Sequence, residues 1–240
     1  TYFIYNTASG TVAITNNVVN RTKMTSTGGD YQVGIYTSAG TNTITGNTVA
    51  NMTTTSSSST SDLAASGIYV AAATPSNIIS GNTVYNIVNT TNTTSTRATG
   101  IYIGSVTSPA AATATLVERN RVYNVANTSL TSTGSNSGLA VGIRVASGSA
   151  TYTNNMVSMG ANTAGESRVS GIENASTGTN NFYYNSLYVN GTVAGTVNNS
   201  YAFQRSSTGT TTLRNNVFYN ERTGGGGNHV GLFVSSTTGW

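Results

Sequence analysis

The side chains that could carry catalysis are few. The chain has six acidic residues and one histidine among 240 residues. A Ca²⁺ ion takes about six to eight oxygen ligands, several of them usually carboxylates, and a glycosidase needs two carboxyl groups within about 5–10 Å. The acidic residues are spread along the whole chain, at Asp30, Asp62, Glu118, Glu166, Glu173 and Glu221. This distribution predicts neither a metal site nor a catalytic carboxylate pair, and we expect no cofactor.

The histidine and the hydroxyl groups give no clearer signal. His229 follows a glycine-rich run at 224–227. A catalytic histidine works beside a nucleophile or an acid within hydrogen-bonding reach. No acidic or serine partner stands at a motif spacing from His229, so we do not expect it to be a catalytic base. So many Ser and Thr residues are present that the sequence distinguishes no nucleophile.

The positive charge is dispersed too. The net charge is +4 and charged residues make up only 7% of the chain. There is no basic run, so the sequence lacks the footprint of a nucleic-acid-binding protein. Arg119 and Arg121 beside Glu118 come nearest to a cluster, which we interpret as a locally paired surface patch. The chain also has no cysteine and no apolar stretch as long as a membrane span.

The strongest pattern is a repeat. Seven times an apolar residue is followed by two residues, an asparagine, any residue and another apolar residue, as in Ile44-Thr45-Gly46-Asn47-Thr48-Val49. The asparagines recur every 30 to 38 residues, at Asn17, Asn47, Asn82, Asn120, Asn155, Asn185 and Asn216. A period of about 20–50 residues indicates a solenoid of stacked structural units.

Each period contains three short strands. A Gly-Ile-Tyr motif such as Gly67-Ile68-Tyr69 precedes each asparagine motif, with variations. The pieces are rich in Ile, Val, Thr and Tyr, which favour strands over helices. We therefore predict an all-β fold, a right-handed parallel β-helix of about seven coils of 29–42 residues. Residues 1–240 form one such segment, and we expect it to be a fragment of a longer chain because no terminal capping repeat is evident.

Stacking turns each apolar position into a column along the axis. The first predicted inward column is Ile35, Ile68, Ile101, Ile143, Ile172, Phe203 and Leu232. The second is Val19, Val49, Val84, Val122, Val157, Leu187 and Phe218. The third is Ile14, Ile44, Ile79, Val117, Tyr152, Phe182 and Leu213. These columns would form the core.

The repeated asparagines lie where the chain bends between the second and third strands. Asparagine tolerates the left-handed conformation that such a bend needs, and stacked asparagines can hydrogen-bond to one another as a ladder. A partial second column follows at Asn51, Asn86, Asn124 and Asn220. Long Ser/Thr-rich loops, such as Thr53 to Ser66 and Asn127 to Val141, are expected on one side.

The outward positions suggest binding surfaces. After the inward Ile, successive coils carry Tyr36, Tyr69, Tyr102, Arg144 and Glu173. A row of exposed Tyr rings could stack on sugars or a protein partner, although stacked Tyr also stabilises neighbouring strands without any ligand. We interpret Arg144 and Glu173 as an exposed salt bridge. A second outward Tyr column contains Tyr85, Tyr123, Tyr188 and Tyr219.

The Gly-Ile-Tyr and Ile-Thr-Gly-Asn-Thr-Val pattern covers essentially the whole chain and resembles right-handed parallel β-helix repeat proteins, such as pectate-lyase-like solenoids. Segments such as Asn185-Ser186-Leu187-Tyr188 look like repeat regions of large secreted surface proteins of Bacteroidota. The resemblance implies export, through a type IX secretion system, and a location outside the cell.

Three functions are compatible with these patterns. We expect a non-catalytic structural or adhesive segment of a secreted or cell-surface bacterial protein, with glycans or further copies of itself as partners. The alternative is a polysaccharide lyase or hydrolase of the β-helix type. Ice binding is a third possibility, but it needs a regular outward Thr array, and the row from Thr15 to Arg214 is interrupted by charged and aromatic residues.

Overall fold

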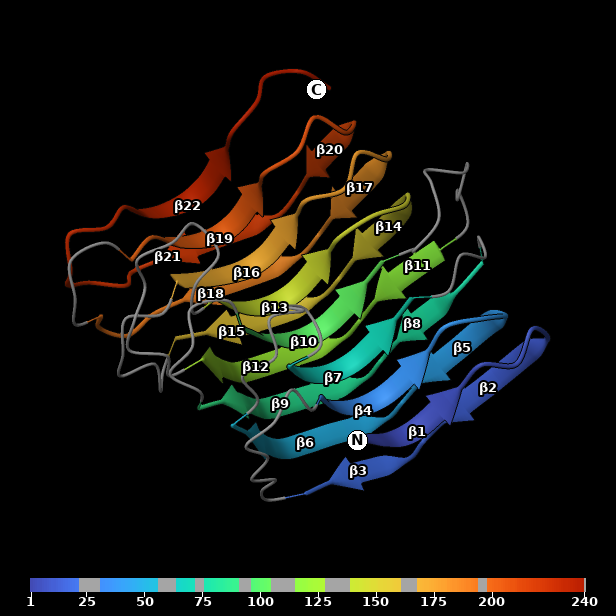
Figure 1. The fold of residues 1–240 in the computed structure, drawn as a ribbon. Helices are drawn as coiled ribbons and strands as arrows, with labels where there is room; N and C mark the ends of the chain where they lie inside the picture. The colour runs from blue at the N-terminus through green and yellow to red at the C-terminus, as the bar shows by residue number, and fades with distance from the viewer. Residues whose placement is uncertain are drawn as a thin grey trace.

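A computed structural model describes residues 1–21, 31–55, 64–71, 76–90, 96–104, 115–127, 139–160, 168–193 and 198–239. These residues form 22 strands and no helix. The strands are stacked in three parallel sheets along one axis, with the first coil at one end of the rod and β22 at the other (Figure 1). The prediction of an all-β parallel solenoid is confirmed.

Each sheet takes one strand from each of seven coils, and sheet A has β22 in addition. Sheet A contains β1 (Tyr2–Asn6), β4 (Gln32–Thr37), β7 (Ala65–Val70), β10 (Arg97–Ile103), β13 (Leu139–Val145), β16 (Arg168–Asn174), β19 (Ser200–Arg205) and β22 (His229–Val234). Sheet B contains β2 (Thr11–Thr15), β5 (Thr41–Thr45), β8 (Ile78–Ser80), β11 (Thr115–Glu118), β14 (Ala150–Thr153), β17 (Asn180–Tyr183) and β20 (Thr211–Arg214). Sheet C contains β3 (Val18–Asn20), β6 (Thr48–Thr54), β9 (Thr83–Asn89), β12 (Arg121–Asn127), β15 (Met156–Met159), β18 (Ser186–Val189) and β21 (Val217–Asn220).

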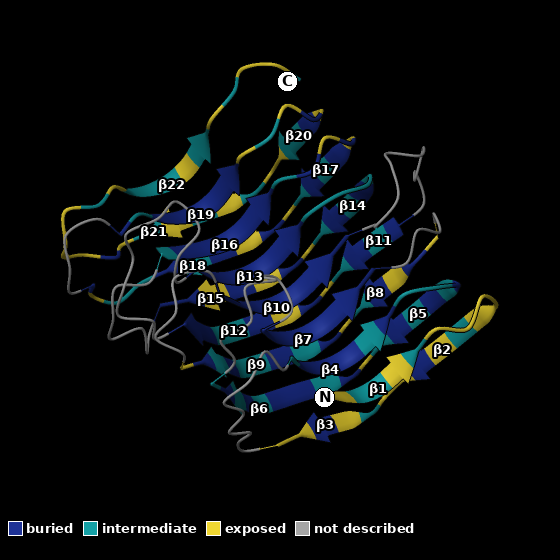
Figure 2. Cartoon of the chain, in the orientation of Figure 1, coloured by how far each residue is buried: buried dark blue, intermediate teal, exposed yellow. Residues whose placement is uncertain are grey.

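The three predicted inward columns form the core. Ile68, Ile101 and Ile143 are paired in register along sheet A and are fully buried. Their counterparts on sheets B and C are buried in the same way, and dark blue bands run through the middle coils (Figure 2). Burial is weaker in the last coil, where Leu232 is 42% exposed because only one neighbouring coil covers it.

The loops are shorter than the sequence indicated where the structure describes them. Thr53 and Thr54 belong to β6, which pairs with β9 beyond a bend at Asn51, and Ala65 already belongs to β7. At the second predicted loop, β13 begins at Leu139. The central parts of both loops, 56–63 and 128–138, lie outside the described residues.

The repeated asparagines form an unbroken ladder. In each of the six steps from Asn17 to Asn216, the backbone N–H and the side-chain Nδ2 both donate to the Oδ1 of the next asparagine. The Nδ2 of Asn120, for example, donates to Asn155 Oδ1 at 3.0 Å and also to the Ile79 carbonyl of the preceding coil at 2.8 Å. The internal rungs are buried, so these bonds satisfy amides that water cannot reach.

The reason first assigned to these asparagines is wrong in one respect. The left-handed backbone falls on the residue before each ladder asparagine, with a φ of 57° at Asn16, 53° at Arg119 and 56° at Tyr184. Gly46 and Gly81 stand at the same place in their coils. The role of the ladder asparagine is therefore that of its side-chain amide. Its Oδ1 accepts hydrogen bonds from the asparagine of one neighbouring coil, and its Nδ2 donates to the asparagine of the other. Left-handed asparagines occur at this preceding position, at Asn16, Asn154 and Asn215, and in the second column, at Asn51, Asn86 and Asn124.

The glycines of the Gly-Ile-Tyr motif allow the inward columns to pack. Gly100 precedes Ile101 in sheet A, and a Cβ atom built on it would lie 2.4 Å from Val122 Cγ1 and 2.6 Å from the carbonyl oxygen of Gly142. Gly67 and Gly142 show the same collision with the valine of their own coil. The motif therefore needs glycine because two sheets and the neighbouring coil meet at this point.

One core residue carries an unsatisfied polar group. Tyr152 is fully buried in the third column and stacks on Phe182, with ring centroids 4.7 Å apart. Its hydroxyl has no hydrogen-bond partner, and burial raises the pKa of Tyr152 far above its ordinary value. The next coil uses Phe182 at the same register, which shows that the space suits a ring without a hydroxyl.

We predict that Asn120→Ala lowers the free energy of unfolding by about 3 kcal/mol, because it leaves the two Asn82 donors and the Ile79 carbonyl without partners in a buried site. Asn17→Ala is the matched control, since this first rung is only half-buried. Chemical denaturation measures the free energy of unfolding of both variants. Equal losses would contradict the explanation that burial of the unpaired donors makes the Asn120 rung costly to remove.

We predict that Gly100→Ala destabilises the chain by about 1–3 kcal/mol through overpacking against Val122. Gly10→Ala is the control, because a Cβ at Gly10 meets no atom within 4 Å. Thermal and urea unfolding of the two variants give the comparison. A Gly100→Ala variant as stable as the parent chain would show that the coil spacing adjusts freely.

We predict that Tyr152→Phe stabilises the chain by about 1 kcal/mol at neutral pH, because it removes a buried hydroxyl that forms no hydrogen bond. Since the folded-state pKa of Tyr152 is raised above the unfolded value of 10.0, only the unfolded state ionises as the pH passes 10, and stability falls there. The variant should lose this part of the alkaline decline. Tyr5→Phe, at a ring 58% exposed, should leave the decline in place when unfolding is measured across this pH range.

Candidate functional site

The described acidic residues lie far apart and have separate partners. Glu118 is on sheet B, Glu173 is on sheet A, and Glu221 follows β21 of sheet C. No group of three His, Asp or Glu residues that could hold a metal occurs among the described residues. Asp30, Asp62 and Glu166 lie outside those residues. The described part of the chain therefore offers no pair of carboxylates for acid–base catalysis.

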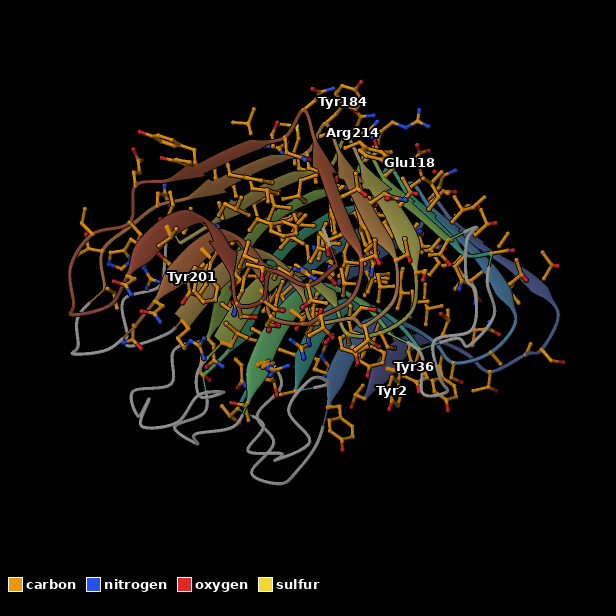
Figure 3. The ribbon with its side chains drawn as sticks, turned by 90° about the horizontal axis from the view of Figure 1, so that it is seen from above. Tyr2, Tyr36, Glu118, Tyr184, Tyr201 and Arg214 are labelled. Carbon is orange, nitrogen blue, oxygen red and sulfur yellow. The ribbon has the colours of Figure 1, made fainter. Side chains whose placement is uncertain are left out.

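The patch predicted around Glu118 is divided between two sheets. Arg119 Nη2 donates to Glu118 Oε1 at 2.5 Å, and Ser80 Oγ donates to the same oxygen at 3.1 Å, so this half of the patch is locally paired as predicted. Glu118 and Arg214 belong to one outward row of sheet B, three coils apart, and Figure 3 shows both on the side of the molecule opposite Tyr36. Arg121 belongs instead to the outer face of sheet C.

Arg144 and Glu173 form a buried ion pair. They face each other in register on β13 and β16, and Arg144 Nη1 donates to Glu173 Oε2. The expectation of an exposed salt bridge is wrong, since their side chains are only 10% and 8% exposed. Tyr102 and Gln204 flank the pair on the neighbouring strands. Removal of one partner would leave a buried charge uncompensated, which indicates a role in holding the coils together.

The tyrosine column beside that pair is also more closed than expected. Tyr69 and Tyr102 stack with ring centroids 4.0 Å apart and are 8% and 9% exposed. Val33 and Ala71 pack against them, and the ring of Tyr102 lies over the backbone at Gly104. The expectation of an open row of rings is therefore wrong for these two residues. Tyr36 is half-buried, and its use in binding stays a prediction.

His229 does have a serine partner, which the sequence did not reveal. Ser200 Oγ lies 2.8 Å from His229 Nδ1, and His229 Nε2 lies 2.9 Å from the Gly224 carbonyl. The two residues are one coil apart, so they meet only through the pairing of β19 with β22. Ser200 is fully buried and also bonded to Asn220 Nδ2 at 3.0 Å. A substrate could not reach this hydroxyl, and the cluster fastens the last coil.

A groove of about 370 Å³ lies on the outer face of sheet C. It crosses β12, β15, β18 and β21, where Figure 2 shows exposed positions on β15. Two outward rows of side chains line it. The first row is Arg121, Met156, Ser186 and Val217, and the second is Tyr123, Ser158, Tyr188 and Tyr219. Met156 and Val217 are each 60% exposed, so the first row presents apolar side chains to the solvent.

The polar groups of the groove are set at its margins. The Arg121 guanidinium lies over the Tyr123 ring, 4.9 Å from its centroid. At the other side, the Tyr188 hydroxyl donates to Glu221 Oε1 and accepts from Asn190 Nδ2. The hydrogen bond to the Glu221 carboxylate raises the pKa of Tyr188 and holds its ring in place. The groove thus combines aromatic faces, exposed hydroxyls and one cation.

The sequence identified only part of this site. Its second Tyr column contains Tyr123, Tyr188 and Tyr219, but Met156, Ser158 and Arg121 were not connected with it. Their positions relative to the ladder asparagines could have done so, because Ser158 stands at the same offset from Asn155 as Tyr123 from Asn120, and Arg121 and Met156 each directly follow their asparagine.

No family model, curated protein or solved structure matches this chain. In the described residues no helix has the length and apolar character needed to cross a membrane. The groove must therefore be interpreted from its own chemistry.

Proposed function

We propose that this chain is a non-catalytic structural and adhesive segment of a large secreted or cell-surface bacterial protein. It acts as a stiff rod that presents side chains from its outer faces to glycans or to neighbouring copies. The location outside the cell rests on the resemblance of its repeats to surface proteins.

The observation that carries this proposal is how the reactive side chains are used. Glu118 is bonded to Arg119, Glu173 to Arg144 and Glu221 to Tyr188. Each pair stands on a different sheet or corner, so the carboxylates of the described residues brace the scaffold and do not converge on a substrate. The hydroxyl of Ser200, which is bonded to His229, is buried and is also used within the scaffold.

The scaffold itself favours a mechanical role. A continuous ladder joins seven coils, and at about 4.8 Å per coil this is a rod of roughly 30 Å. Rigid rods hold their surface groups at constant spacing, which favours binding of extended repetitive polymers. The outer row of sheet B does not suit ice, because Glu118, Tyr183 and Arg214 interrupt the Thr residues.

The test is incubation with a panel of neutral and anionic polysaccharides, with and without Ca²⁺. We expect retention of one or more polysaccharides in affinity electrophoresis, with no new reducing ends and no unsaturated products. Cleavage of any polysaccharide would overturn the non-catalytic assignment in favour of a lyase or hydrolase. A chain that retains none of them would overturn the adhesive half of the proposal.

A further inference from the structure

The outer Tyr row of sheet C has one gap. In register from β9 to β21 the row is Tyr85, Tyr123, Ser158, Tyr188 and Tyr219. Ser158 is exposed and stands where its neighbours on both sides carry a ring. The gap therefore separates two stacked pairs, Tyr85–Tyr123 and Tyr188–Tyr219.

The geometry of the two pairs turns this gap into a slot. The rings of Tyr85 and Tyr123 are parallel within 1°, with centroids 4.9 Å apart. Parallel rings at this distance stack with an offset, as aromatic pairs prefer. Tyr123 and Tyr188 stand on the strands at either side of Ser158, and the Arg121 guanidinium lies over the Tyr123 ring. These two strands are two spacings apart, about 9.6 Å, and at Ser158 no ring fills the interval between them.

The edges of the slot favour a sugar over a purely apolar ring. The hydroxyls of Ser158 and Ser186 are exposed beside it, one in each row. A pyranose ring presents C–H groups on its faces and hydroxyls around its edge. One face would contact the Tyr188 ring, the other would lie toward Tyr123 and the guanidinium over it, and the edge would reach the serine hydroxyls and water.

The charge of the groove favours an anion. Arg121 is the one charged residue that lines it, and among the described residues Arg121 forms no ion pair, whereas the Glu221 carboxylate at the margin accepts a hydrogen bond from Tyr188. Its guanidinium, held over Tyr123, still presents donors to a carboxylate or a sulfate. A nucleic acid would need several cations along its backbone, and the groove supplies one.

We propose that the Ser158 slot binds a sugar ring of an anionic glycan, with the acidic group on Arg121 and the ring between Tyr123 and Tyr188. This inference rests on the proposed adhesive function and adds to it a site and a ligand class. Carboxylated and sulfated glycans share the required chemistry, and the test distinguishes them.

The main test variant is Ser158→Tyr, which fills the slot by continuing the row. The matched control is Thr153→Tyr, an outward position of the same coil on sheet B that lies beside Tyr183. The probes are polygalacturonate, dextran sulfate and uncharged dextran, with binding measured by affinity electrophoresis and calorimetry. We expect Ser158→Tyr to weaken binding of the anionic probes at least tenfold, and Thr153→Tyr to bind like the parent chain.

Two further variants make the result decisive. Arg121→Gln should remove the preference for the anionic probes over dextran. Ser158→Glu places a carboxylate at an exposed position and should repel the same probes even if Ser158→Tyr does not fold, as judged by circular dichroism. Unchanged binding by folded Ser158 variants, or an unchanged anionic preference in Arg121→Gln, would overturn the site. If the parent chain binds no glycan at all, the adhesive function fails, which is a separate result.

Discussion

The hydrogen-bonded stacking of one coil on the next is the constraint on which the rest of this molecule depends. Parallel pairing fixes the coil spacing, and the asparagine ladder supplies the same spacing in side-chain amides from Asn17 to Asn216. An amide suits this position because it offers both donors and an acceptor, so each rung satisfies its neighbour. A carboxylate would repeat like charges along the column, and an apolar residue would leave backbone donors such as the Asn82 N–H buried without partners.

This spacing also explains why like residues follow one another on every face. A ring at one coil finds a ring of the next coil at stacking distance, both in the core at Tyr152–Phe182 and outside at Tyr69–Tyr102. Stacked rings stabilise neighbouring strands of the rod whether or not a ligand is bound. A break in a row therefore points to a binding role more strongly than the row itself. Ser158 lacks the stacking contact that its neighbours make, so its presence is not explained by stabilisation of the rod.

Much of the fold could be predicted from the sequence because it depends on local, repeated patterns. The inward columns, the strand triplets and the ladder follow from the repeat and from the two-residue alternation of strands. Two local details were misjudged. The left-handed backbone lies one residue before the ladder asparagine, and the extra pairing beyond Asn51 lengthens the strands of sheet C. Both depend on how the corner closes between coils, which a linear motif does not specify.

The sequence by itself determined the architecture and the shortage of catalytic groups, because periodicity and composition require no knowledge of packing. Only the tertiary structure decided which outward positions are open. Tyr102 and Arg144 face outward by alternation, but residues from other coils and segments bury them, whereas Tyr219 and Met156 on sheet C stay exposed. The structure likewise revealed the hydrogen bond between Ser200 and His229 and the position of Arg121 over the Tyr123 ring. Exposure and contact between coils are properties of the assembled surface, and the strand pattern is the same for a covered face and a free one.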